Sequence, residues 1–191
     1  MWGGVILSFF LGIVGVAVAT IVAVLVIAYS SVKRRSGLAG NVLTSVLCSV
    51  ALTSGIVTNP PAERLVTIVL AGVLLSLLLF SREIVKDIAD MDFDGDLGKR
   101  TLPIEFGATR SYQISALSLL GTSLIAGLIS LTLFNSGSIA FLVLVVLYLI
   151  MSLRVWVARQ NEAVSHATNL KYVLFLSLVV WSAWVGANVV V

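Results

Sequence analysis

Apolar stretches recur along this chain at the length of a membrane-spanning helix. A helix needs roughly 20 apolar residues to cross a hydrocarbon core about 30 Å thick. Runs near this length predict six spanning helices, at approximately 3–28, 40–57, 65–80, 113–134, 138–157 and 170–191. The third run is the shortest, and we expect its helix to continue into the charged segment that follows. Since no linker or internal repeat interrupts the pattern, it predicts one all-α domain over residues 1–191, a multi-pass transmembrane helical bundle.

Composition and charge placement support this reading. The chain is 59% hydrophobic and only 11% charged, far below the quarter or so of charged residues in soluble proteins. The net charge is +3, and the basic residues are divided among three connections, which argues against a nucleic-acid-binding surface. Basic residues concentrate on the cytoplasmic side of membrane proteins. We therefore expect a cell-membrane protein whose odd-numbered connections face the cytoplasm, because these carry eleven of the twelve basic residues: Lys33, Arg34, Arg35, Arg82, Lys86, Lys99, Arg100, Arg110, Arg154, Arg159 and Lys171.

The third connection, residues 81–112, concentrates its acidic residues in the segment 82–103, "REIVKDIADMDFDGDLGKRTLP". If the third helix continues to about residue 93, the spacing puts Glu83, Asp87, Asp90 and Asp94 on one helical face. Such close carboxylates repel one another unless a positive charge lies among them. Oxygen ligands in this arrangement suit Mg²⁺, which is commonly shared between carboxylates and the phosphate oxygens of a substrate. Asp92 and Asp96 point away from this face, and we expect them to be solvated.

Two other readings of the acidic segment stay open. Its carboxylates could simply neutralise neighbouring basic side chains in a solvated loop. The segment also begins like a calcium-binding loop, with Asp90, Asp92, Asp94 and Gly95 at the first, third, fifth and sixth places. The twelfth place, however, is Thr101 where a bidentate Glu is needed, and "LPIEFG" is a poor start for a partner helix.

A second polar cluster follows the first apolar run, at "AYSSVKRR". Tyr29 and Lys33 are four residues apart and share a helical face. They could mark a membrane interface, or they could grip a diphosphate together with Mg²⁺ held by the aspartates. Asn41 begins the second run, as either a helix cap or a polar group facing the same cavity.

These motifs resemble those of the UbiA superfamily of intramembrane prenyltransferases. "SREIVKDIADMDFDGDLGKRTLPIEFG" is similar to the second aspartate-rich motif of that family, and Tyr29 to Lys33 matches its Tyr-x-x-x-Lys motif. The resemblance is strongest to the archaeal branch, which adds a geranylgeranyl group to geranylgeranylglyceryl phosphate in ether-lipid synthesis.

The resemblance implies an enzyme that transfers a prenyl group from prenyl diphosphate to a lipid acceptor within the membrane. Aromatic or tetrapyrrole acceptors are the alternative. Asp87, Asp90 and Asp94 would hold Mg²⁺, and these three and Lys33 would form the catalytic set. Substrate contacts would come from Tyr29, Lys33, Asn41, Arg82 and Lys86.

One family feature has no counterpart here. Family members have nine spans and a first motif of the form Asn-Asp-x-x-Asp-x-x-x-Asp, and the six runs of this chain correspond to the last six spans. The resemblance therefore implies a domain that is incomplete at its N-terminus. It could work with a separate N-terminal fragment, work as a homo-oligomer, or be an inactive relative that binds isoprenoid lipid.

Overall fold

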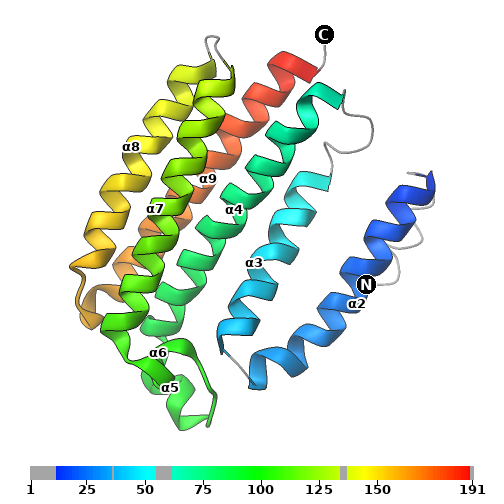
Figure 1. Cartoon of the computed structure of the whole chain (residues 1–191). Helices are drawn as coiled ribbons and strands as arrows, with labels where there is room; N and C mark the ends of the chain where they lie inside the picture. The colour runs from blue at the N-terminus through cyan, green and yellow to red at the C-terminus, as the bar shows by residue number, and fades with distance from the viewer. Residues whose placement is uncertain (1–11, 36, 55–61, 134–136, 190–191) are drawn as a thin grey trace.

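The computed structural model describes residues 12–35, 37–54, 62–133 and 137–189, and the side chains of some residues within these ranges, 30–35 among them, lie outside its description. All regular structure in these residues is helical (Figure 1), which confirms the predicted fold class. The elements in chain order are α2 (Gly12–Arg35), α3 (Gly37–Ser54), α4 (Ala62–Ala89), α5 (Met91–Asp96), α6 (Leu102–Phe106), α7 (Ala108–Leu133), α8 (Gly137–Trp156), the 3₁₀ turn η2 (Gln160–Glu162) and α9 (Ala163–Val189).

The six long helices correspond to the six predicted spans. Four stretches in the described residues are long and apolar enough to cross a membrane: Ile68–Ala89, Ala108–Leu131, Ile139–Trp156 and Gln160–Ala183. In α3 the apolar part is shorter, at Gly37–Val50. The first predicted span overlaps α2, and residues 3–11 of that span lie outside the described residues.

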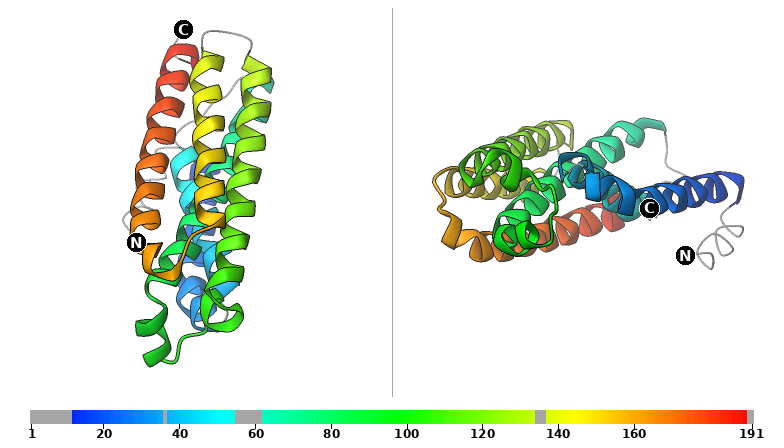
Figure 2. Two further views of the ribbon diagram at one scale, coloured as in Figure 1. Left: turned by 90° about the vertical axis from the view of Figure 1, so that its left-hand side faces the viewer. Right: turned by 90° about the horizontal axis from the view of Figure 1, so that it is seen from below.

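Helix α4 lies at the centre of the bundle. It packs against α3, α7 and α9, while α8 packs against α7. Helix α2 lies at the edge of the bundle beside α3 (Figures 1 and 2). The α2–α3 and α8–α9 connections lie at the same end as α5 and α6, which we call the α5–α6 end (Figure 1). This end therefore gathers the three connections in which the basic residues concentrate.

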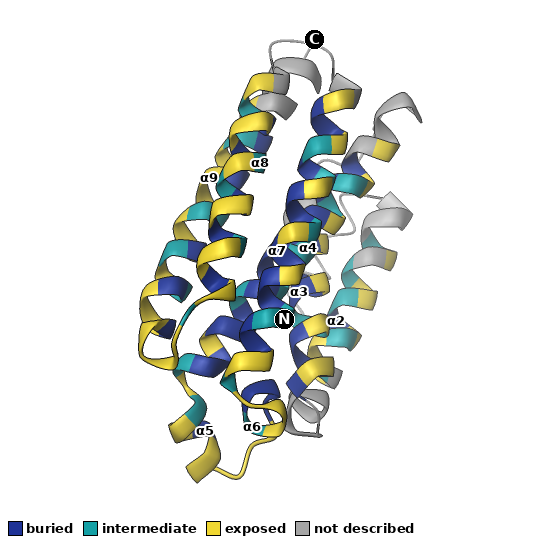
Figure 3. Ribbon diagram, turned by 60° about the vertical axis from the view of Figure 1, so that its left-hand side comes forward, coloured by how far each residue is buried: buried dark blue, intermediate teal, exposed yellow. Residues whose placement is uncertain are grey.

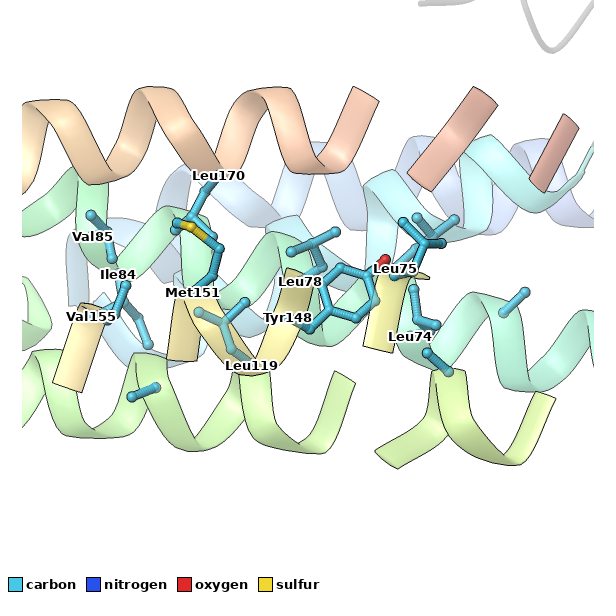
Figure 4. Packing of buried hydrophobic residues seen from close by; sticks show 14 of the residues in the cluster. Leu74, Leu75, Leu78, Ile84, Val85, Leu119, Tyr148, Met151, Val155 and Leu170 are labelled. Atoms are coloured by element: carbon cyan, nitrogen blue, oxygen red, sulfur yellow. The ribbon is translucent and has the colours of Figure 1, made fainter. Parts of the chain in front are cut away.

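The core forms where α4, α7, α8 and α9 face one another. Leu78, Leu119, Tyr148 and Val155 have no exposed surface and pack in one cluster (Figure 4). Exposed residues follow the outward faces of the same helices (Figure 3). Lipid tails are as apolar as these side chains, so close van der Waals packing holds such helices together in a membrane.

Serine hydroxyls add polar contacts between α4 and α7. Ser81 Oγ and Ser115 Oγ are 2.6 Å apart, and Ser118 Oγ donates to Leu77 O at 2.8 Å. Small side chains of this kind let two helix backbones approach closely, and their hydrogen bonds satisfy hydroxyl groups that lipid cannot solvate. These bonds fix how α7 sits along α4, the helix that carries the acidic segment.

The third spanning helix continues into the charged segment, as predicted, but it stops short of residue 93. It ends at Ala89, Asp90 is a turn residue with φ −95° and ψ 7°, and α5 starts at Met91. Carboxylates are unfavourable near the C-terminus of a helix and favourable near the N-terminus, because of the helix dipole. Breaking the helix at Asp90 places Asp92 and Asp94 in the first turn of a new helix. The predicted face of four carboxylates is therefore divided between two helices.

The rest of the acidic segment is folded tightly. Gly98 and Gly107 adopt left-handed backbone conformations with φ of 64° and 82°, which glycine takes without steric cost. Pro103 is in the first turn of α6, where its missing N–H is not needed. The segment "LPIEFG" forms only the five-residue helix α6, which ends at Gly107.

Candidate functional site

A buried amide–carboxylate pair joins α3 to α4 near the α5–α6 end. Asn41 Nδ2 donates a hydrogen bond to Asp87 Oδ2 at 2.7 Å. Asn41 is 0% exposed and Asp87 is 4% exposed. Because α3 begins at Gly37, Asn41 lies one turn inside the helix and is not its cap. Of the two roles left open for Asn41 by the sequence, the structure supports the inward-facing polar group.

Gly37, the first residue of α3, lies very close to the backbone of the segment that follows α5. A Cβ added to Gly37 would lie 2.6 Å from Thr101 Cα and 2.7 Å from Arg100 O, closer than side chains tolerate. Glycine therefore allows this approach, which sets where α3 begins relative to the acidic segment. Further along the two helices, Ser49 Oγ lies 2.6 Å from Ser76 Oγ. The two contacts together hold α3 in the register that brings Asn41 to Asp87.

One helical turn before Asp87, α4 carries a second buried carboxylate. Glu83 Oε1 accepts a hydrogen bond from Arg82 Nη1 at 2.9 Å in an ion pair. Arg82 Nε is also buried and has no hydrogen-bond partner among the described residues. The sequence predicted Arg82 as a contact for diphosphate oxygens. In the structure its guanidinium is half-buried beside Glu83, and the buried Nε–H has no partner among the described residues.

The three predicted metal ligands occupy different surroundings. Asp87 is buried against α3, Asp90 is exposed at the turn, and Asp94 is buried with an ion pair to Lys99 Nζ at 2.5 Å. Within the described part of the chain, no three His, Cys, Asp or Glu side chains group so as to hold a metal ion. The structure does not bring the three aspartates together, and their role as ligands stays a prediction.

The remaining predicted site residues lie around this end of the bundle. Lys86, Asp92 and Asp96 are exposed, and Tyr29 is half-buried in α2. Lys33 belongs to α2 by its backbone, but its side chain lies outside the described residues. The solvent exposure expected of Asp92 and Asp96 is therefore present.

One feature of this site was missed from the sequence. It is Gly37, which lies four residues before Asn41 and whose close contact depends on a segment more than sixty residues away. The Arg82–Glu83 and Lys99–Asp94 ion pairs are of the kind expected in the other reading of the acidic segment, in which its carboxylates neutralise neighbouring basic side chains.

The oxygen atoms at the Asn41–Asp87 pair fit a hard divalent cation. Asn41 Oδ1 is buried and accepts no hydrogen bond from any described residue. Asp87 lies beside it through the bond to Nδ2. Carboxylate and amide oxygens are the ligands preferred by Mg²⁺ and Ca²⁺. Asp87 and Asn41 are thus the described residues whose donor atoms suit the Mg²⁺ that the sequence resemblance implies.

Fold and site define a polytopic α-helical membrane protein with a buried carboxylate at one end of its bundle. A model of the UbiA prenyltransferase family matches residues 1–186. The chain belongs to the UbiA prenyltransferase family, and it is an integral membrane protein. The resemblance found in its motifs is thereby confirmed.

Several curated relatives are named digeranylgeranylglyceryl phosphate synthase. The protein from Natronomonas pharaonis is 34% identical over 113 residues, covering 59% of this chain and 40% of the relative. The Haloquadratum walsbyi protein is 37% identical over 97 residues, 49% of this chain and 32% of the relative. The Pyrococcus furiosus protein is 36% identical over 117 residues, 60% of this chain and 40% of the relative. These matches therefore span two fifths or less of each relative's length.

A solved structure shares the fold. It is described as a study of digeranylgeranylglyceryl phosphate synthase in membranes, and it superposes with a TM-score of 0.79 at 23% sequence identity. The superposition covers 93% of this chain and 63% of that chain. The arrangement of helices α2 to α9 is therefore that of a known membrane protein.

Proposed function

We propose that this chain takes part in Mg²⁺-dependent transfer of a geranylgeranyl group from its diphosphate to a lipid acceptor. The acceptor we favour is geranylgeranylglyceryl phosphate, because the curated relatives are named for the product of that transfer. Family membership supports the reaction class. The identities of the prenyl donor and of the acceptor are part of this proposal.

The observation that carries this proposal is the buried Asn41–Asp87 pair. Ionisable side chains buried in a membrane bundle are rare and commonly mark functional sites. In a prenyltransferase, the Asp87 carboxylate would hold the cation that binds the diphosphate. Bound Mg²⁺ supplies electrostatic stabilisation of the negative charge that develops on the leaving pyrophosphate.

The cationic side chains of this chain would bind and orient the diphosphate. Arg82 has a buried Nε without a partner among the described residues, and Lys86 is exposed one turn further along α4. Tyr29 and Lys33 are predicted to contact the same oxygens from α2. The apolar helices would accommodate the isoprenoid tail and keep water away from the reacting carbon, where water would otherwise capture the prenyl group.

Asp90 and Asp94 remain proposed ligands that must move to take part. Asp94 would have to leave Lys99, and Asp90 would have to turn inward from the exposed end of α4. The three aspartates and Lys33 form the proposed catalytic set. Additional acidic ligands could come from a separate N-terminal fragment or from a second copy of the chain, and we propose either as a partner.

We also propose that the α5–α6 end faces the cytoplasm at the plasma membrane. The basic residues concentrate in the connections at this end, as expected for cytoplasmic loops. Water-soluble Mg²⁺ would then reach the site from the cytoplasm, while both lipid substrates would enter from the bilayer.

The test is a transfer assay with the purified chain in lipid nanodiscs. Labelled geranylgeranyl diphosphate, Mg²⁺ and geranylgeranylglyceryl phosphate should give labelled product that EDTA abolishes. Asp87→Asn should abolish product, whereas Asp92→Asn, which changes an exposed carboxylate nearby, should not. Supplying an N-terminal fragment from a curated relative tests the partner proposal in the same assay. If no product forms with or without the fragment, the proposed activity is contradicted.

A further inference from the structure

The two ends of the Asn41 side-chain amide have different surroundings. Nδ2 donates to Asp87 Oδ2 at 2.7 Å, while Oδ1 is buried and accepts no hydrogen bond within the described part of the chain. The orientation of this amide is fixed by its partner, since a carboxylate accepts hydrogen bonds and only the NH₂ group can donate them. Oδ1 is therefore the end of the amide that is buried without a described partner.

A buried acceptor without a partner carries a cost. Leaving such a group unsatisfied costs about 1–3 kcal/mol, so each case in a native structure calls for a ligand, an ion or a water. Ser45 Oγ donates to the backbone oxygen of Asn41 and not to Oδ1. Arg82 Nη1 pairs with Glu83, and Arg82 Nε has no partner among the described residues. Neither of these contacts satisfies Oδ1.

We infer that Asn41 belongs to the cation site itself, with Oδ1 as a neutral oxygen ligand beside the carboxylate of Asp87. This inference rests on the proposed Mg²⁺-dependent function and goes further by assigning a ligand from α3. Nδ2 would hold Asp87 in place while Oδ1 binds the cation, so one side chain both positions a ligand and supplies one. The sequence resemblance predicted that Asn41 contacts the substrate, whereas this inference makes Asn41 a ligand of the cation.

A neutral ligand has a consequence for the charge of the site. Glu83 is paired with Arg82 and Asp94 with Lys99, so these carboxylates are already balanced. As a neutral ligand, Asn41 adds an oxygen to the site without adding negative charge. More of the cation's positive charge is then left for its second task of binding a diphosphate.

The experiment measures Mn²⁺ binding to the purified 191-residue chain in nanodiscs, by electron paramagnetic resonance without any substrate. Mn²⁺ replaces Mg²⁺ at oxygen sites and gives a readout that does not depend on turnover. Asn41→Leu should weaken binding by about 10- to 100-fold, as loss of a supporting group at a metal site does. Asn41→Asp loses the donor to Asp87 but keeps an oxygen ligand at the same place, so it should bind more tightly than Asn41→Leu. Asn169→Leu, which changes a partly exposed asparagine in α9, is the matched control and should leave the affinity unchanged.

Each of the other possible outcomes contradicts one step of the inference. If Asn41→Asp binds as weakly as Asn41→Leu, Asn41 acts only as a hydrogen-bond donor to Asp87 and is not a ligand. If Asn41→Leu binds like the wild type while Asp87→Asn loses binding, Asn41 is outside the cation site and the proposed function stands. If the wild type binds no Mn²⁺, the inference and the proposed cation chemistry both fail. Thermal unfolding of each variant confirms that it is folded, and Asn41→Asp tests the inference even if Asn41→Leu does not fold.

Discussion

Gly37 and Thr101 touch backbone to backbone at the α5–α6 end. A Cβ on Gly37 would lie 2.6 Å from Thr101 Cα, and the next nearest atoms, Arg100 O and Leu102 N at 2.7 and 2.8 Å, also belong to the backbone. Backbone atoms cannot rotate away as a side chain can. The start of α3 and the segment between α5 and α6 therefore have to move together.

This contact predicts that Gly37→Ala is destabilising. Forcing a methyl group into a tightly packed position typically costs about 1–3 kcal/mol, and we expect the thermal unfolding midpoint in detergent to fall accordingly. Gly95→Ala is the matched control, because a Cβ there meets nothing within 4 Å and alanine favours the helix. An unchanged midpoint for Gly37→Ala would show that α3 can withdraw from residues 100–102 without cost.

The ion pair between Lys99 and Asp94 predicts that Lys99→Met loosens α5. The Lys99 side chain is 42% exposed, whereas that of Asp94 is 9% exposed. Half-exposed pairs contribute little to global stability, about 0–1 kcal/mol. The expected effect is therefore local, as faster amide hydrogen exchange over residues 94–100. Lys171→Met, at an exposed lysine of α9, should leave that exchange unchanged, and equal exchange in both variants would contradict the pair's role.

Arg82 is expected to influence cation and diphosphate binding in opposite directions. Arg82→Gln leaves Glu83 without its counter-charge near Asp87, so the site becomes more negative. Removing a positive charge at close range is worth on the order of 1 kcal/mol or more, or about fivefold in affinity. Isothermal titration should show tighter Mn²⁺ binding and weaker pyrophosphate binding. Arg110→Gln, at an exposed arginine of the same end, is the control; weaker binding of both ligands would point to a loss of structure instead.

The hydrogen bond between Tyr148 and Ser177 predicts a modest stabilisation inside the bundle. The two hydroxyl oxygens are 2.6 Å apart, and both side chains are buried. Bonds of this kind between membrane helices average about 0.6 kcal/mol and reach about 1.7. Tyr148→Phe should lower the free energy of unfolding by that amount, while Tyr172→Phe, at an exposed tyrosine, should not. A loss far above this range would indicate a rearranged core.

The fold was largely predictable from the sequence because a chain that crosses a lipid bilayer must satisfy its own backbone hydrogen bonds. Long apolar runs must become helices in a membrane, and six runs gave six long helices. The short helices α5 and α6 were not predicted. Local charges and backbone conformations determine where such short helices form, and the hydrophobic pattern carries no information about either. The turn at Asp90 is the clearest case, since four carboxylates at helical spacing were compatible with one helix or with two.

The sequence indicated which residues belong to the site but not which of them are in contact. Asp87 and Asn41 were both singled out, yet they are 46 residues apart in sequence and no pattern in either segment indicates that they touch. Their contact depends on how α3 slides along α4, which Gly37 and the Ser49–Ser76 contact set. Such register depends on shape at the helix interface, and a single sequence does not record it.

The most direct test of the central claim is whether Asp87 confers Mg²⁺-dependent diphosphate binding. Geranylgeranyl diphosphate affinity is measured on the chain in nanodiscs, with Mg²⁺ and with EDTA, for the wild type, Asp87→Asn and Asp92→Asn. We predict that Mg²⁺ tightens binding by at least about tenfold, as an electrostatic clamp on a diphosphate should, in the wild type and in Asp92→Asn but not in Asp87→Asn. Binding that is equally tight in EDTA, or that responds to Mg²⁺ in Asp87→Asn as in the wild type, would contradict the account.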